Sequence, residues 1–244
     1  MKKSFIKIVL LLSLLVSSFS FTSTKLYVGT NAEFEPFEYL KDGKIVGFDI
    51  ELMEEVSKLI GKEIEVKNLA FDGLLPALQS KKIDIIIAGM TATDDRKKFV
   101  NFSDAYYSSE QMIVLNKESD VNIKNFEELS GKQVGVVLGF TGDIAVSKVK
   151  DAKVVRFNGT GEAVMALKSK RVDVIVLDAE PAKKYAAQNE ELIIKETEVA
   201  KEEYAIAIRK DDPALLEEIN KALSTLKENG KYAELMKKYD LLKD

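Results

Sequence analysis

The stretch FDGLLPALQSKKIDIIIAGMTATDDRKKFVNFSDAYY, residues 71–107, carries the pattern that decides the fold. It begins with a segment whose apolar residues Leu74, Leu75 and Leu78 have helical spacing. After the basic turn SKK comes the run IDIIIA, residues 83–88, which is short, apolar and rich in β-branched side chains. Such a run is typical of a buried strand in a parallel sheet. The stretch therefore predicts a helix that leads into a central strand.

The same arrangement recurs in the second half of the chain. LQSKKIDIIIAG at residues 78–89 is echoed by LKSKRVDVIVLD at residues 167–178. Each segment contains a helix end, a basic turn, an aspartate and an apolar strand. The echo predicts two similar lobes with an α/β fold, although unrelated helix-to-strand connections also look alike.

The C-terminal region has a different pattern. The segment YAIAIR at residues 204–209 predicts a strand. Asp212 and Pro213 then predict the start of a long amphipathic helix, with the aspartate as the N-cap residue, and Gly230 predicts its end.

The composition excludes several kinds of chemistry. The 244 residues include no His and no Cys. The chain therefore has no histidine general base, no disulfide, no thiolate metal site and no lipid-modified cysteine. We expect no catalytic residue, no metal and no cofactor. A net charge of −4 argues against nucleic-acid binding.

The N-terminus has the three parts of a secretory signal peptide. Basic residues at 2–3 precede an apolar run at 5–16 and then small residues, so we expect residues 1–20 to be removed after Ser20. An uncleaved anchor is the alternative. Without Cys the lipoprotein route is closed, and the chain is expected to be a free periplasmic protein.

Several segments, taken in order, resemble the polar amino-acid-binding proteins of ABC importers. These are extracellular solute-binding proteins of family 3, with the type II periplasmic binding fold. Besides residues 71–107, the segments are GTNAEFEPFEY (29–39), IVGFDIEL (45–52), LGFTGD (138–143), VDVIVLDAEP (172–181) and LKENGKYAELMKKY (226–239). Arginine-binding members look closest, from LGFTGD to VVRF and in EEYAIAIRKDD (202–212).

The resemblance implies a two-lobed α/β fold with two mixed sheets flanked by helices. Residues 24–108 and 203–244 would form a discontinuous first lobe, and residues 109–202 an inserted second lobe. Two strands, near residues 106–111 and 200–204, would form the hinge between them.

A ligand carboxylate needs positive charge and hydrogen-bond donors, and the resemblance assigns this role to Arg96, Thr91, Thr141 and Gly142. A guanidinium matches a carboxylate with two parallel hydrogen bonds. Backbone N–H groups near Thr141, where a helix is expected to begin, can meet the same carboxylate. The alternatives are a solvated arginine and an ordinary turn.

A ligand ammonium needs a carboxylate and hydrogen-bond acceptors. The resemblance assigns it to Asp178, Gly89 and Thr91. Asp178 follows a buried strand, and ligands of α/β lobes gather at the carboxyl ends of such strands. The alternative for Asp178 is the N-cap of the next helix.

The resemblance assigns the ligand side chain to Asn31, Glu33, Phe34, Phe71, Met90 and Leu138. Aromatic faces suit an aliphatic stem or a cation, although both rings could also be core residues. Several members with cationic or amide ligands have Asp at the position of Asn31. Glu33, on the same loop, could restore that charge.

We therefore expect a binding protein, not an enzyme. Its partners would be a free L-amino acid and the permease and ATPase of an ABC importer, and it is expected to be a monomer. Arginine or lysine is favoured and glutamine is the alternative ligand. A periplasmic prephenate or arogenate dehydratase and a sensor module are alternatives of other classes.

Overall fold

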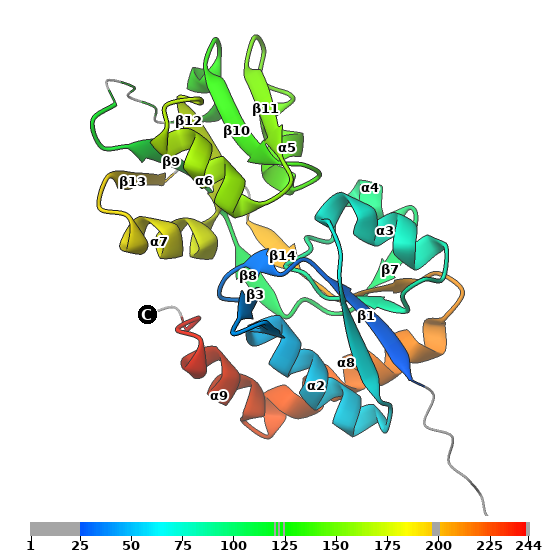
Figure 1. Cartoon of the computed structure of the whole chain (residues 1–244). Coiled ribbons are helices and arrows are strands. Elements are labelled where there is room, and N and C mark those ends of the chain that lie inside the picture. Colours follow the sequence, from blue (N-terminus) through cyan, green and yellow to red (C-terminus); the bar gives the residue numbers. More distant parts are fainter. Residues whose placement is uncertain (1–24, 120, 122, 124, 197–200, 243–244) are drawn as a thin grey trace, which may run out of the picture.

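A computed structural model describes residues 25–119, 121, 123, 125–196 and 201–242 (Figure 1). The predicted signal peptide, residues 1–20, lies outside these residues. Within the described residues, no helix has the length and apolar character needed to cross a membrane.

The first sheet is mixed and has the strand order β5-β1-β6-β15-β7. Its strands are β1 (Leu26–Thr30), β5 (Ile64–Asn68), β6 (Ile85–Ile86), β7 (Val100–Phe102) and β15 (Ala207–Arg209). β1 pairs in parallel with β5 and β6, whereas β15 is antiparallel to β6 and β7. β6 is shorter than the predicted strand 83–88.

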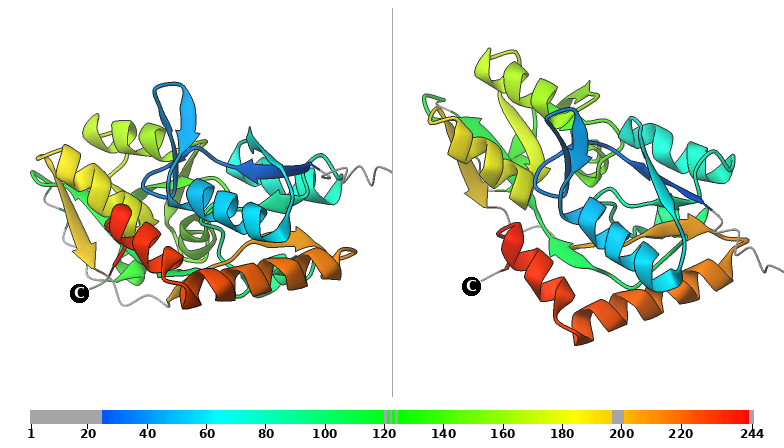
Figure 2. Two further views of the ribbon diagram at one scale, coloured as in Figure 1. Left: turned by 90° about the horizontal axis from the view of Figure 1, so that it is seen from below. Right: turned by 60° about the horizontal axis from the view of Figure 1, so that its bottom comes forward.

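Four helices accompany the first sheet, and a further short helix precedes β7. They are α2 (Phe48–Ile60), α3 (Phe71–Gln79), α4 (Asp94–Lys97), α8 (Pro213–Glu228) and α9 (Lys231–Lys238). α3 contacts β1 and β6, while α2, α8 and α9 contact one another along the base of this lobe (Figure 2). Asp212 caps α8 as predicted, because its carboxylate accepts a hydrogen bond from the Leu215 amide at 3.2 Å.

The second sheet is also mixed and has the order β11-β10-β12-β9-β13. Its strands are β9 (Gln111–Asn116), β10 (Gln133–Val137), β11 (Lys153–Phe157), β12 (Val174–Asp178) and β13 (Leu192–Glu196). The helices of this lobe are α5 (Thr141–Val146), α6 (Thr160–Lys168) and α7 (Ala179–Gln188), with a 3-10 turn at Phe126–Leu129. Their β-branched and leucine side chains fill the space between helices and sheet.

Two short antiparallel strands, β8 (Tyr107–Ser109) and β14 (Glu202–Tyr204), run between the lobes (Figure 1). A small third sheet, formed by β2 (Glu33–Phe34), β3 (Glu38–Lys41) and β4 (Lys44–Val46), extends from the first lobe. The predicted α/β class with two mixed sheets is therefore confirmed. The lobe boundaries inferred from the resemblance stay a prediction.

The sequence echo has a structural counterpart. The first basic residue of each turn, Lys81 or Lys170, has a left-handed backbone, with φ of 61° and 56° respectively. The aspartate that follows accepts a backbone hydrogen bond from the neighbouring parallel strand in both lobes. Asp84 accepts from Tyr27 at 2.9 Å, and Asp173 accepts from Gln133 at 2.7 Å. The two lobes therefore use the same connection between helix and central strand.

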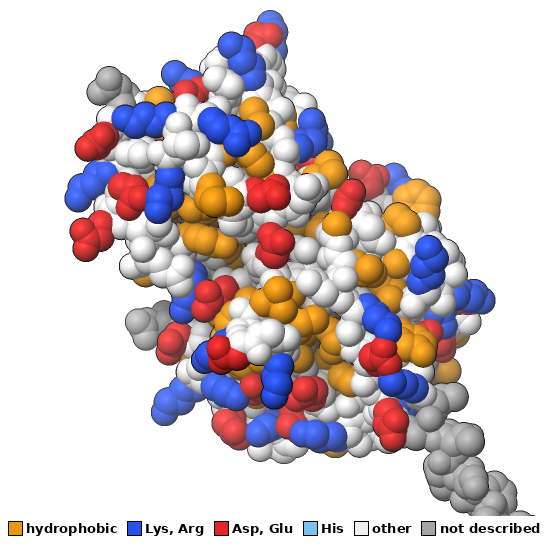
Figure 3. Space-filling view, viewed as in Figure 1, with side chains coloured by type: hydrophobic (Ala, Val, Ile, Leu, Met, Phe, Trp, Pro, Cys, Tyr) orange, Lys and Arg blue, Asp and Glu red, His pale blue; other side chains and the backbone are white. Residues whose placement is uncertain are grey.

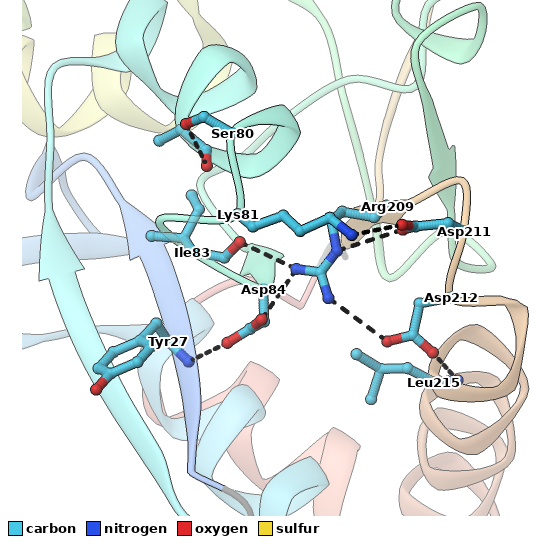
Figure 4. A network of polar contacts seen from close by, with 10 residues as sticks. Tyr27, Ser80, Lys81, Ile83, Asp84, Arg209, Asp211, Asp212 and Leu215 are labelled. Atoms are coloured by element: carbon cyan, nitrogen blue, oxygen red, sulfur yellow. Dashed lines mark hydrogen bonds and ion pairs between the residues drawn. The ribbon is translucent and has the colours of Figure 1, made fainter.

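Arg209 stabilises the amino-terminal end of the parallel strands in the first lobe (Figure 4). It donates to the Ile83 carbonyl at 3.2 Å and to Asp84 at 2.9 Å, and it forms ion pairs with Asp211 and Asp212. This network joins β15, β6 and the start of α8. It lies at the opposite end of the strands from the candidate site, so it supports the fold and not the ligand.

Candidate functional site

The predicted carboxylate and ammonium residues gather where strands of the two lobes end and face each other. Gly89 and Thr91 follow β6, Thr141 follows β10, and Asp178 ends β12. The lobes touch here, since Phe140 of the second lobe packs against Phe34 and Phe71 of the first, with ring centroids 5.4 and 4.3 Å apart.

Arg96 is a buried cation at this junction. The residue is 7% exposed, so the alternative of a solvated arginine does not hold. Its guanidinium donates to the Thr91 carbonyl at 2.8 Å and to the Gly139 carbonyl of the other lobe at 2.9 Å. It also lies 5.3 Å from the centroid of the Phe71 ring. Burial lowers the pKa of Arg96. Among the described residues, no carboxylate forms an ion pair with it.

Asp178 is the buried anion of the site, with 3% exposure. It occupies the N-cap position of α7, but its side chain makes no capping hydrogen bond. The carboxylate instead accepts a hydrogen bond from the Tyr204 hydroxyl at 2.6 Å. Burial and then the charge of Glu202 raise the pKa of Asp178 well above its ordinary value.

Glu202 is a third charged residue at the junction, and the sequence did not single it out. Its Oε2 atom accepts hydrogen bonds from Thr91 at 3.1 Å, Thr141 at 2.8 Å and Gln111 at 3.2 Å. The alternation in the segment EEYAIAIR was the available signal, because it places Glu202 on the same side of the strand as Tyr204. Gln111, at the start of β9, was also not identified from the sequence.

The position of Gly89 is fixed by its backbone conformation and by a hydrogen bond to the buried carboxylate of Asp49. Its φ is 52°, and an added Cβ would overlap the Phe34 ring, so glycine is required here. The Gly89 amide donates to Asp49 at 2.9 Å, and Tyr106 donates to the same oxygen at 2.7 Å. Burial raises the pKa of Asp49 to about 6, and these hydrogen bonds oppose the rise.

The segment with Gly89 and Thr91 is attached to the hinge strand β14. Thr91 forms an antiparallel bridge with Tyr204, the Ala205 amide donates to the Met90 carbonyl at 3.1 Å, and the Ala92 amide donates to the Glu203 carbonyl at 3.1 Å. A movement of β14 would therefore move this segment as well.

The loop before α5 is held by a charge pair in the second lobe. Asp143 accepts from the Gly139 amide at 3.1 Å and from Arg156 at 3.1 Å. The first N–H groups of α5, from Thr141 onward, have no acceptor within the helix. Gly142 packs so closely that a Cβ would lie 2.8 Å from the Gln111 Oε1 atom.

The residues predicted to contact the ligand side chain differ in how deeply they are buried. Phe34, Phe71 and Met90 are buried, and Met90 belongs wholly to the core cluster. Asn31 is buried and donates its amide to the Leu69 carbonyl at 3.0 Å, while Leu138 is half-buried. Glu33 is exposed.

Glu33 reaches across to the second lobe. An added Cβ at Gly159 would overlap its carboxylate, so this carboxylate lies at the N-cap residue of α6. Beside it, Glu35 forms an ion pair of 3.2 Å with Lys184 of α7. Acidic side chains are visible along the boundary between the lobes in Figure 3. We call the approach of Glu33 to Gly159 the rim contact.

No group of three or more acidic residues within the described chain could hold a metal ion. Fixed charges and hydroxyl groups from both lobes make up the site. Chemically, this arrangement can bind a small molecule that carries both an anion and a cation.

Known proteins share this architecture. Residues 26–241 match the model for bacterial extracellular solute-binding proteins, family 3. The chain is 39% identical over 224 residues to the arginine-binding extracellular protein ArtP of Bacillus subtilis, which covers 88% of this chain and 86% of that protein.

Two solved structures resemble the fold closely. A mutant of ArgBP from T. maritima has a TM-score of 0.85 and 47% identity, covering 88% of this chain and 94% of that one. An ancestral arginine-binding protein bound to glutamine has a TM-score of 0.85 and 45% identity, covering 89% and 98%. These are two-lobed binding proteins, so the predictions of a type II fold and of a binder, not an enzyme, are confirmed. The chain belongs to the bacterial extracellular solute-binding proteins of family 3.

Proposed function

We propose that this chain is the substrate-binding component of an ABC importer and that it binds a free polar L-amino acid between its lobes. The observation that carries the proposal is the pair of oppositely charged groups buried at the junction, Arg96 and Asp178. A buried charge without an ion-pair partner is costly, and a zwitterion would neutralise both groups at once.

In this proposal the ligand carboxylate binds Arg96, Thr91, Thr141 and the Gly142 amide. Its ammonium group binds Asp178, the Gly89 carbonyl and Thr91. The guanidinium supplies two parallel donors, and the first N–H groups of α5 supply others. Because α5 has six residues, we assign these contributions to individual N–H groups and not to a helix dipole.

The proposed mechanism is hinge closure. The ligand docks on the first lobe, and the second lobe adds Thr141 and Asp178. The closed form is then favoured by contacts that the open form lacks. A permease with its ATPase would read the closed form, and we propose that the chain acts as a periplasmic monomer without a lipid anchor.

A basic ligand, arginine or lysine, is the first choice. Glu33 and Glu35 lie at the boundary between the lobes, and the aromatic rings suit a ligand side chain with a long aliphatic stem that ends in a cation. The names of ArtP and ArgBP agree with this choice. Glutamine is the second candidate, because Asn31 is neutral and a similar protein binds glutamine.

A thermal-shift screen of the twenty amino acids, ornithine and citrulline tests the proposal. A ligand at about 100 times its Kd adds about 2.7 kcal/mol to the free energy of unfolding, which corresponds to a rise of roughly 5–10 °C in Tm. We expect arginine and lysine to give the largest rise. A response to glutamine alone would favour the second candidate, and no response to any amino acid would contradict the proposal.

A further inference from the structure

One oxygen of Glu202 is the point where hydrogen bonds from both lobes meet. Glu202 lies on the hinge strand β14 and is 9% exposed. Its Oε2 atom accepts from the Thr91 hydroxyl of the first lobe at 3.1 Å, and from the Thr141 hydroxyl and the Gln111 amide of the second lobe at 2.8 and 3.2 Å. One carboxylate oxygen therefore joins three segments that are far apart in the sequence.

The chemistry of the partners fixes the direction of these hydrogen bonds. A carboxylate oxygen only accepts, and a side-chain amide nitrogen only donates. The Gln111 Nε2 atom donates to the Thr141 hydroxyl oxygen at 3.1 Å as well as to Glu202. The Thr141 hydroxyl thus accepts from Gln111 and donates to Glu202, and the Thr91 hydroxyl likewise donates to Glu202.

A hydroxyl group has a single proton to donate. In this structure the protons of Thr91 and Thr141 both go to Glu202. While these bonds persist, neither hydroxyl can donate to the carboxylate of a bound amino acid. Thr91 and Thr141 can then contribute to that carboxylate only through their backbone N–H groups, beside the Arg96 guanidinium. The oxygen of the Thr91 hydroxyl keeps a lone pair that can accept from an ammonium group.

We infer that Glu202 is a positioning residue of the proposed amino-acid site. It fixes the hydroxyl groups of Thr91 and Thr141, one from each lobe, and thereby holds the lobes together from the hinge. This inference rests on the proposed function. It assigns Glu202 to the closing contacts that the protein makes with itself, whereas the ligand carboxylate binds Arg96 and backbone N–H groups.

The location of Glu202 explains how one residue can act on both lobes. β14 pairs with β8 between the lobes, and Tyr204 of β14 forms a bridge with Thr91. The partner from the first lobe thus lies next to the hinge, while the partners from the second lobe approach with their lobe. All three bonds can form together only when the lobes are close. They therefore stabilise the closed form and raise the apparent affinity for any amino acid.

A competing role for Glu202 predicts the opposite effect on affinity. If Thr91 and Thr141 instead donate to the ligand carboxylate, Glu202 occupies their protons and must be displaced before a ligand can bind. Removal of the Glu202 charge would then tighten binding, because a competing acceptor and a repelling negative charge are both lost. A positioning role predicts weaker binding. The sign of the change in affinity therefore separates the two roles.

Glu202→Gln removes the charge and keeps one oxygen that can accept hydrogen bonds. Hydrogen bonds to a charged acceptor are roughly twice as strong as those to a neutral one, so affinity should fall about tenfold for every amino acid that the wild-type protein binds. Isothermal titration calorimetry measures these dissociation constants. Glu203→Gln is the matched control, because Glu203 is the neighbouring residue of β14 and its side chain is exposed.

A double-mutant cycle tests whether Thr141 acts through Glu202. Thr141→Val removes the hydroxyl and keeps the branched shape, whereas Thr141→Ser keeps the hydroxyl. We expect Thr141→Val to lower L-arginine affinity about tenfold and Thr141→Ser to bind within about twofold of the wild type. In the Glu202→Leu background, which has no acceptor, the loss caused by Thr141→Val should shrink to about twofold. A general weakening of the fold would instead add to the effect of Glu202→Leu.

Several outcomes would overturn the inference and leave the proposed function standing. They are tighter or unchanged binding by Glu202→Gln, a loss confined to one amino acid, and an equal loss from Thr141→Val with and without Glu202. Where Glu202→Leu does not fold, Glu202→Gln still gives the sign of the effect. L-glutamine replaces L-arginine as the probe if arginine does not bind. If no amino acid binds the wild-type protein, the proposed function itself fails.

Discussion

The inner and outer ends of the candidate site hold their charges in different ways. At the inner end, Arg96, Asp178 and Glu202 are buried and fixed by hydrogen bonds from both lobes and the hinge. At the outer end, Glu33 is exposed and approaches α6 at Gly159. Charges interact more strongly where water is excluded, so the inner end should dominate affinity.

The comparison also separates two tasks. In the proposed binding mode, the inner end would contact the carboxylate and ammonium groups that all amino acids share, so variants of Arg96 and Asp178 should affect every ligand alike. Under the same proposal, the outer end would contact the variable side chain and the closing lobe, so its variants should have smaller effects, and a change at Glu33 should be the most selective. The predictions below test this division in order of decreasing effect.

Arg96→Ala should have the largest effect and remove measurable binding of every amino acid. A buried charge partner is worth about 3–5 kcal/mol when it is deleted, which is roughly a 100- to 1,000-fold loss of affinity or more. Isothermal titration calorimetry measures this loss. Arg171→Ala, a change at an exposed arginine, is the control and should bind normally. Binding of any amino acid by Arg96→Ala at micromolar Kd would contradict the assignment.

Asp178→Asn should weaken all ligands by a similar factor, about 10- to 100-fold, because a hydrogen bond to a charged group contributes about 1.5–3 kcal/mol. Asparagine keeps an oxygen that can accept from Tyr204, so the fold should be preserved. Calorimetry with arginine, lysine and glutamine tests the prediction. A loss confined to one class of side chain would place Asp178 at the outer end instead.

Part of the fold could be predicted from the sequence, whereas the roles of the charged site residues could not be derived from local sequence alone. The helix start at Asp212 and the repeated turn before Asp84 and Asp173 follow from local chemistry, and the structure contains both. The roles of Arg96 and Asp178 came from the resemblance and stay predictions.

Glu202 could not be found in this way. Its partners Thr91, Gln111 and Thr141 come from three other segments, which meet only when the hinge strands pair. Burial of a carboxylate by tertiary contacts leaves no local pattern beyond an alternating strand. The predicted strand 83–88 was too long for a related reason, since only Ile85 and Ile86 lie between two hydrogen-bonded neighbours.

Gly159→Ala tests the rim contact. The added methyl group would overlap the Glu33 carboxylate and move it from the start of α6, where a negative charge contributes about 0.3–1 kcal/mol. We expect affinity to fall about two- to fivefold for all ligands, with less compaction on ligand binding in small-angle scattering.

Gly161→Ala is the matched control for this variant. It lies in the same turn of α6, and its Cβ would meet only the Tyr185 hydroxyl at an ordinary 3.6 Å. Any change in capping would appear in the Tm of Gly159→Ala without ligand, and this separates helix stability from closure. Equal affinities for both variants would show that the rim contact contributes nothing to closure.

Glu33→Gln should have the smallest and most selective effect. An exposed charge pair contributes about 0.2–1 kcal/mol, so arginine affinity should fall about twofold while glutamine affinity falls less, and added salt should reduce the difference. Glu54→Gln, at an exposed position of α2, is the control. Competition calorimetry gives the arginine-to-glutamine ratio. A charge that selects cations must change the arginine-to-glutamine affinity ratio when it is neutralised, so an equal loss for both ligands would assign Glu33 to closure alone. Unchanged arginine affinity would remove Glu33 from the site.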